Sequence, residues 1–456
     1  MLSAWGCSRP QDASFIAAER ATGWASEWSP ARSLFFLRYP GRNIPMTSDP
    51  QREGKAKMQV SENKVVGACA VCHSVNHLFF ESLGPLFPFL IPAFGLSYTE
   101  AGRIGFVYYL FYGLSNYPSG HWADRYGRRK MILLFLLFSS GATLLMAFSR
   151  SLWQLLLCAG LAGVGGSLYH PPGTEMVSDA VPATRRGVAL GVHGSGGSFG
   201  TLLAFLIGGG AAVFIGWRIA LAILSVVGFL LLAWFRVALG TKDPVPLVSN
   251  AGGYIISNET AFVPLLRVLS VFLLIYGIIM VTFKGAYVLM PTYIKDTFHV
   301  STGKAVVFCI IMPLVGIFSN IAMGRFCDRY GRKKSLVIVF LFLSACFFLL
   351  FLEKRLFLLP LLVVVGFLIN SFSPISNAYT ADLIPPELRG KAFGIIFTFS
   401  ICLSSLSPYI MGTISDRTSL ATGMIFLSGA SLLGAGVSMI NPGGRGSRDP
   451  GIEACR

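Results

Sequence analysis

The segment from Cys69 to Glu81 holds the densest set of chemically active side chains in an otherwise apolar stretch. It reads CAVCHSVNHLFFE, and His73, His77 and Glu81 are spaced i, i+4 and i+8, which puts them on one stripe of a helix with Asn76 beside it. Such imidazole and carboxylate groups can handle protons near neutral pH or bind a transition metal. The first five residues also match C-x-x-C-H, the spacing of a covalent haem site.

The composition places this stripe in a membrane. The chain has 456 residues, 54% hydrophobic and 13% charged, with mean hydropathy +0.64, whereas about 25% of the residues in soluble domains are charged. From Lys64 onward, apolar segments long enough to cross a bilayer alternate with short polar breaks. We predict an all-α membrane protein with twelve transmembrane helices, at 65–92, 102–120, 131–148, 152–174, 187–214, 217–235, 264–293, 304–323, 335–352, 356–378, 391–413 and 420–440.

The distribution of positive charge indicates a topology. The net charge is +16, and Lys and Arg concentrate in alternate short breaks, as expected for cytoplasmic loops rather than for a nucleic-acid surface. We therefore expect a protein of the cytoplasmic (inner) membrane, with both termini cytoplasmic and no nucleic-acid partner. The C-x-x-C-H motif then lies near the cytoplasmic end of a packed helix, where haem is not attached, so we expect no cofactor.

An internal repeat organises the chain. GHWADRYGRRK, from Gly120 to Lys130, returns as GRFCDRYGRKK from Gly324 to Lys334, and DAVPATRRGVALG returns as DLIPPELRGKAFG. This predicts a duplicated six-helix unit. We expect two pseudo-symmetric bundles, 64–235 and 264–440, joined by a cytoplasmic linker at 236–263, with disordered extensions at 1–63 and 441–456. We also expect translation to start at Met46 or Met58.

The repeated loop resembles the signature loop of the major facilitator superfamily, over about Lys64 to Ile440. The resemblance implies two six-helix halves, a central cavity lined by helices 1, 4, 7 and 10, and loops that stabilise one of two access states; a merely topogenic basic loop is the alternative. Glycines at 120 and 324 are expected to permit close helix contact, and the aspartates to meet a helix N-terminus or an Arg. The loop residues are Gly120, Asp124, Arg125, Gly127, Arg128, Gly324, Asp328, Arg329, Gly331 and Arg332.

The repeat supplies a partner for Glu81. Its counterpart in the second half is Lys284, and both lie deep in the first helix of their half. An unpaired charge near the bilayer centre costs about 2.5–3.5 kcal/mol on insertion scales. We hypothesise an ion pair that breaks and reforms as the halves rock, with a static structural pair as the alternative.

Two further histidines lie in apolar segments, His170 before Pro171 in helix 4 and His193 in helix 5. We expect His193 to be a satisfied hydrogen-bonding residue, because helix 5 packs outside the cavity in this superfamily. For His73, His77 and His170, proton handling is the favoured interpretation, and a transition-metal site is the third possibility.

These segments resemble the fosmidomycin-resistance type of drug and proton antiporter. The matching residues are His73, Asn76, His170, Pro171, Gly196, Gly197 and Gly200. The departures are His77 in place of an acidic residue, Ala204-Phe205 in place of a glycine-proline pair, and Ala159 in place of an Arg.

The resemblance and the residues together predict a secondary active transporter rather than an enzyme. We expect a monomer that moves a small organic solute across the bilayer by alternating access, as proton-coupled efflux. The expected coupling and cavity residues are His73, Asn76, His77, Glu81, His170 and Lys284, with no bound metal. A proton-coupled importer of an organic anion and a non-transporting membrane sensor are the alternatives.

Overall fold

The computed structural model describes residues 60–240, 243–244, 259–383 and 389–440, and every regular element among them is a helix. This confirms the predicted all-α class. Nearly all of the predicted N-terminal extension, most of the linker and the tail at 441–456 lie outside the described residues.

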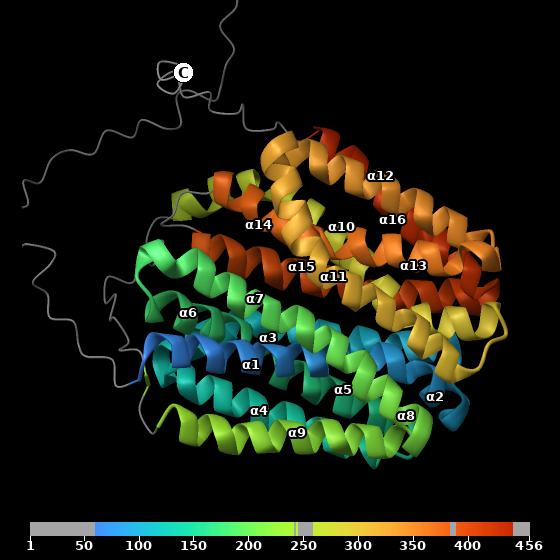
Figure 1. Ribbon diagram of the computed structural model, residues 1–456, viewed down its shortest axis with the longest axis horizontal. Helices are drawn as coiled ribbons and strands as arrows, with labels where there is room; N and C mark the ends of the chain where they lie inside the picture. Colours follow the sequence, from blue (N-terminus) through green and yellow to red (C-terminus); the bar gives the residue numbers. More distant parts are fainter. Residues whose placement is uncertain (1–59, 241–242, 245–258, 384–388, 441–456) are drawn as a thin grey trace, which may run out of the picture. The chain divides into compact units, whose positions relative to one another are not determined.

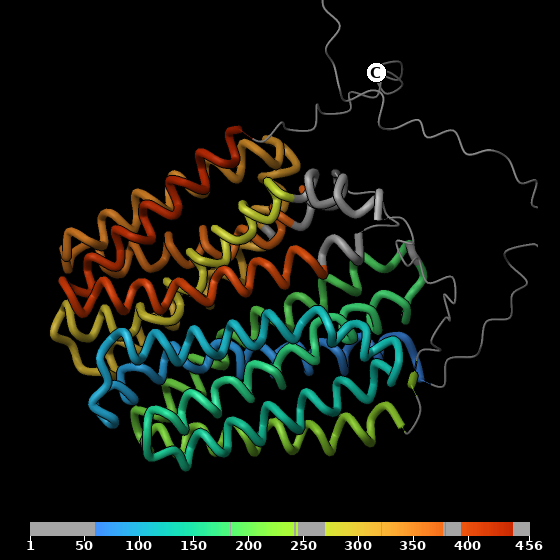
Figure 2. Tube along the Cα trace, turned by 180° about the vertical axis from the view of Figure 1, so that it is seen from behind, coloured from blue at the N-terminus to red at the C-terminus, as the bar shows by residue number. Residues whose placement is uncertain are grey.

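The two halves form two bundles that lie side by side, the first blue to green and the second yellow to red in Figures 1 and 2. The first half contains α1 (Glu62–Glu81), α2 (Leu83–Phe94), α3 (Tyr98–Tyr126), α4 (Arg128–Ala147), α5 (Leu152–Ser167), α6 (His170–Ala180), α7 (Arg186–Leu203), the π-helix η2 (Ala204–Gly210), α8 (Ala211–Ile215) and α9 (Trp217–Ala238). The second half contains α10 (Glu259–Thr297), α11 (Thr302–Tyr330), α12 (Arg332–Phe351), α13 (Arg355–Asn370), α14 (Phe372–Leu383), α15 (Arg389–Arg417) and α16 (Leu420–Ile440).

The number of membrane-spanning helices agrees closely with the prediction. In the described part of the chain, 11 helices or joined helices are long and apolar enough to cross a bilayer. The predicted span at 102–120 is not among these 11. It lies in α3, which has 29 residues but carries charged residues at both of its ends, among them Glu100, Arg103, Asp124 and Arg125. Its length suits a spanning helix, and its polarity keeps it below the hydropathy that marks the others.

Equal helix lengths support the duplication. α3 and α11 both have 29 residues, α4 and α12 both have 20, and α5 and α13 both have 16. Each 29-residue helix meets its 20-residue neighbour at a repeated basic loop. We call the end of the bundle that holds these loops the basic end, and the end at which α3 begins the opposite end.

Three spans are interrupted four residues before a proline. Proline has no N–H to donate, and its ring collides with the carbonyl of the residue four positions earlier, so a helix yields at that point. The last residue before the break and the proline are Glu81 and Pro85, Ser167 and Pro171, and Asn370 and Pro374. The breaks fall in mid-span, where they change the direction of the chain next to buried polar side chains.

The two halves meet closely along α3 and α15. A Cβ on Gly102 would collide with the carbonyl oxygen of Pro408, and one on Gly412 would collide with that of Tyr98. Only glycine allows backbones to approach to this distance. These contacts lie toward the opposite end, so the halves are packed together there.

Hydrogen bonds join α15 and α10 to the start of α3 at the same end. The Asp416 carboxylate of α15 accepts hydrogen bonds from the backbone N–H groups of Tyr98 and Thr99, both 2.8 Å long, at the start of α3. The Tyr98 hydroxyl donates to Asp296 of α10 at 3.0 Å. The N-terminus of α3 favours a carboxylate at the position of Asp416.

Replacing Gly102 should open the opposite end. We expect Gly102→Leu to separate α3 from α15, since its side chain cannot coexist with the Pro408 carbonyl. Cys402 of α15, which packs against Gly113 of α3, reports the separation through its rate of thiol labelling, measured by mass spectrometry. The rate should rise several-fold in Gly102→Leu. In the control Gly141→Leu it should not change, because a Cβ at Gly141 meets nothing within 4 Å; equal rates in all three proteins would contradict the prediction.

Candidate functional site

Four histidines of the first half form one cluster, which we call the histidine cluster: His73 and His77 of α1, His170 of α6 and His193 of α7. The ring centroid of His73 lies 4.8 Å from that of His77, 5.0 Å from that of His170 and 4.1 Å from that of His193. Side chains from three helices therefore meet at the stripe of α1.

Local sequence explains how each helix brings its histidine to this point. The break before Pro171 starts a new helix at His170, which turns this ring toward α1. On α7, a Cβ at Gly196 or Gly200 would collide with a backbone carbonyl of α1, so these glycines allow α7 to lie directly against it. Ser74 donates to the Gly196 carbonyl at 2.7 Å across this contact.

The tautomers of two rings follow from their partners. His73 Nδ1 lies 2.7 Å from the backbone oxygen of His193, and because a carbonyl only accepts, Nδ1 carries the proton. Tyr169 donates its hydroxyl hydrogen to the Cys69 carbonyl, so at 3.0 Å its oxygen accepts from His193 Nε2. His193 is thus a satisfied hydrogen-bonding residue, as predicted. It also stacks on His73, and neither this contact nor the part of Tyr169 was predicted from the sequence.

Asn76 holds three helices together. Its amide donates to the Gly166 carbonyl of α5 at 2.8 Å, and its oxygen accepts from the Tyr112 hydroxyl of α3 at 3.1 Å. The side chain is 1% exposed. Both ends of the amide are engaged, so in this conformation Asn76 positions α1 and does not offer a free group to a ligand.

Glu81 and Lys284 form a buried ion pair between the halves. Lys284 Nζ lies 2.5 Å from Glu81 Oε1, and both side chains are 1% exposed. The ammonium group also lies 3.5 Å from the centroid of the Phe80 ring and 4.5 Å from that of Tyr109, a cation–π environment. The predicted contact is confirmed; its part in coupling stays a prediction. The pair is enclosed by aromatic rings rather than set across an open cavity.

The two basic loops turn at glycines with positive φ, 95° at Gly127 and 89° at Gly331, a conformation that other residues adopt only with strain. The close helix contact expected at the other two loop glycines is not seen at Gly120 and stays a prediction at Gly324. A Cβ on Gly120 would lie 3.6 Å from Pro171, an ordinary contact, and one on Gly324 would meet no described atom within 4 Å. The steric requirement therefore lies at the turn itself.

The charged loop residues differ between the halves. Asp328 pairs with Arg332 across the second turn, as predicted for this aspartate, whereas Asp124 is exposed on the last turn of α3. Arg128 instead pairs with Glu175 at 3.2 Å and Asp179 at 2.8 Å on α6. The first loop is thereby tied to the helix that carries His170.

Two contacts of the loops were not predicted from the sequence. Arg125 lies over the Tyr126 ring at 5.5 Å, and Arg329 lies over Tyr330 at 5.4 Å, so the Arg that follows the Asp of each motif has a repeated aromatic partner. Asp243, within the predicted linker at 236–263, accepts from the backbone N–H of Arg129 at 2.9 Å and so caps α4.

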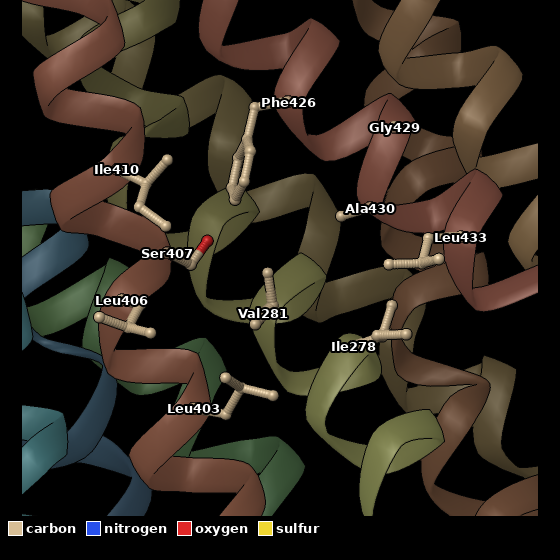
Figure 3. A pocket seen from close by; sticks show the side chains of 10 residues that line it. All are labelled: Ile278, Val281, Leu403, Leu406, Ser407, Ile410, Phe426, Gly429, Ala430 and Leu433. Carbon is tan, nitrogen blue, oxygen red and sulfur yellow. The ribbon is translucent and has the colours of Figure 1, made fainter. Parts of the chain in front are cut away.

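A separate pocket of about 430 Å³ lies in the second half, between α10, α15 and α16. Figure 3 shows side chains from the three helices surrounding it, with the Ser407 hydroxyl as the one polar group among them. The other lining residues are Ile278, Val281, Leu403, Leu406, Ile410, Phe426, Gly429, Ala430 and Leu433. Such a lining suits an apolar group and offers no charge for coupling.

Comparison with known proteins decides the family. The family model of the Major Facilitator Superfamily matches residues 69–400 and 272–450. The chain belongs to the major facilitator superfamily. It is therefore a multi-pass membrane protein of a transporter family, and the inference that it is not an enzyme rests on this membership.

Individual relatives of this superfamily are distant but nearly full-length. The chain is 23% identical over 397 residues to the fosmidomycin resistance protein of Escherichia coli (strain K12), covering 83% of this chain and 93% of the relative. It is 23% identical over 355 residues to the cis,cis-muconate transport protein of Acinetobacter baylyi, covering 74% and 84%. A bacterial homologue of the human lysosomal transporter Spinster has the same fold, with a TM-score of 0.69 at 17% identity, over 84% of this chain and 97% of that one. The first of these supports the predicted branch.

The buried pair should be energetically coupled. Glu81→Gln leaves a buried ammonium without its partner, and Lys284→Met leaves a buried carboxylate, and each loss costs about 3–5 kcal/mol in comparable pairs. We expect each single variant to lower the thermal unfolding temperature in detergent, and the double variant to recover most of the loss, because no unpaired charge remains. If the effects of the two single changes simply add in the double variant, the two charges do not stabilise each other.

Proposed function

We propose that this transporter exports a small organic solute in exchange for protons, by alternating access between the two halves. The observation that carries the proposal is the Glu81–Lys284 pair, because it joins the halves inside the membrane. Any movement that separates the halves at this depth must break it. A separated charge in the membrane is costly, so pair breaking favours protonation of Glu81, and this links the movement to a proton.

The remaining site residues take supporting parts in this proposal. His73, His77 and His170 would line the path of the proton to the pair. Phe80 contacts both sides of this path, with its ring centroid 6.0 Å from that of His77 and 3.5 Å from the Lys284 ammonium group. Asn76 fixes α1 against α3 and α5. The solute would bind beside the histidine cluster, against the pair.

The same proposal assigns a state and a topology. The basic end would face the cytoplasm, with both termini on that side of the inner membrane. Closure of the opposite end by Asp416 and by the contacts of α3 with α15 would then correspond to an inward-facing state. The basic loops at Gly127 and Gly331 would stabilise the alternative, outward-facing state. The working unit would be the monomer.

Import of an organic anion is the rival function. A Lys284 released from Glu81 could bind a carboxylate, and one relative is named for transport of cis,cis-muconate, a dicarboxylate. The fosmidomycin resistance protein, in contrast, is named for a drug. The two functions differ in the direction in which protons move relative to the solute.

Purified protein in liposomes with an internal pH dye tests the coupling. Fosmidomycin or cis,cis-muconate is added outside to wild type, to Glu81→Gln and to the exposed control Glu353→Gln. We expect a solute-dependent change of internal pH in the wild type and the control, and its loss in Glu81→Gln. An unchanged signal in Glu81→Gln would remove this carboxylate from the proton path.

The sign of the pH change separates the two functions, whichever way the protein is inserted. In exchange, solute entry drives protons out, so the internal pH rises. In cotransport, solute and protons enter together, so the internal pH falls. We expect a rise with fosmidomycin; a fall with cis,cis-muconate and no response to the drug would favour the importer.

A further inference from the structure

Three imidazole groups of the histidine cluster face one another with no carboxylate or thiolate among them. His73, His77 and His170 each offer one ring nitrogen, and these three atoms lie within 4.8 Å of one another. The fourth histidine of the cluster, His193, is not part of this group, and its Nε2 is hydrogen-bonded to Tyr169.

His73 presents a lone pair that the fold leaves without a partner. Its Nδ1 carries the proton and donates to the His193 carbonyl, so Nε2 of the neutral ring is an acceptor. Nε2 is buried with no hydrogen-bond partner, in a side chain that is 7% exposed. A buried polar atom of this kind is uncommon in native proteins.

His77 is oriented in the same way. Its Nδ1 lies 3.3 Å from the Thr201 hydroxyl, which donates to the Gly197 carbonyl at 3.3 Å. When the Thr201 hydroxyl donates to Gly197, it accepts from His77 Nδ1, and the lone pair of His77 is then on Nε2. In this tautomer both rings use Nδ1–H to hold their orientation and leave Nε2 available.

Metal-binding histidines in proteins are held in the same way. The ring nitrogen that does not bind the metal donates to a carbonyl or another acceptor, and this hydrogen bond fixes the tautomer. We propose that His73, His77 and His170 bind a divalent first-row transition metal, with Zn²⁺ as the type. A tetrahedral site with Zn–N bonds of about 2.0–2.1 Å places its ligand nitrogens about 3.3 Å apart. The rings must therefore turn inward by about 1.5 Å at their widest separation.

The ligand set selects the class of metal. Neutral imidazoles suit Zn²⁺, Co²⁺, Ni²⁺ and Cu²⁺, whereas Mg²⁺ and Ca²⁺ take oxygen ligands. Three protein ligands leave a fourth position for water. All three histidines belong to the first half, so the metal joins α1 to α6 without tying the halves together, and its binding is independent of the direction of transport.

Cobalt provides the measurement, because tetrahedral Co²⁺ has intense visible d–d bands. Full-length protein without a histidine tag is titrated with Co²⁺ in detergent, and Zn²⁺ is then added as competitor. We expect one Co²⁺ per chain, with bands that Zn²⁺ abolishes. His73→Gln, His77→Gln and His170→Gln should each lose them, while the control His121→Gln, exposed on α3, should keep them.

A variant that gains an absorption band separates the loss of a metal ligand from misfolding. In His77→Cys the thiolate should replace the imidazole and add a sulfur-to-cobalt charge-transfer band, which a collapsed site cannot produce. Each glutamine variant is also compared with wild type by gel filtration and thermal unfolding. Absence of tetrahedral bands in the wild type, or bands that persist when all three histidines are replaced, would overturn the assignment.

Discussion

The cost of burying a charge in the membrane shapes this structure. Glu81 and Lys284 are each 1% exposed, and neither could stay charged at that depth without the other. They lie on different halves, so the pair makes the electrostatic state of one half depend on the position of the other. The rings of Phe80 and Tyr109 exclude water from the ammonium group and strengthen this dependence, since opposite charges attract more strongly where the dielectric is low.

Two helix breaks set the positions of Glu81 and His170. α1 ends at Glu81 because Pro85 cannot complete the next turn, and α5 ends at Ser167 because of Pro171. One break therefore ends a helix at the acidic partner, and the other lets a new helix start at His170. If α5 and α6 were one continuous helix, the regular helical rotation from Ser167 would fix the direction of the His170 side chain.

Sequence predicted most of the fold because membrane helices and repeats leave local signals. Apolar runs predict the spans to within a few residues, and the repeat offset alone pairs Glu81 with Lys284. The contacts of Tyr169 and His193 could not be predicted, because the rotation of one helix against another depends on packing. The loop glycines show the same limit: the motif contains Gly120 and Gly127 alike, and only the backbone angle of 95° at Gly127 shows which one is required.

The repeat also shows how the two halves differ. Moving 203 positions along the chain, the offset of Glu81 and Lys284, takes His73 to Tyr276, Asn76 to Ile279 and His77 to Met280. The second half thus keeps the architecture but has no histidine at these positions, and it carries a buried charge at Lys284 of α10. The clustered histidines and Glu81 lie on one half, and Lys284, the partner of Glu81, lies on the other. Because the groups of the first half and Lys284 share one interface in the middle of the membrane, a change in the charge of either half alters the energy that holds the two halves together.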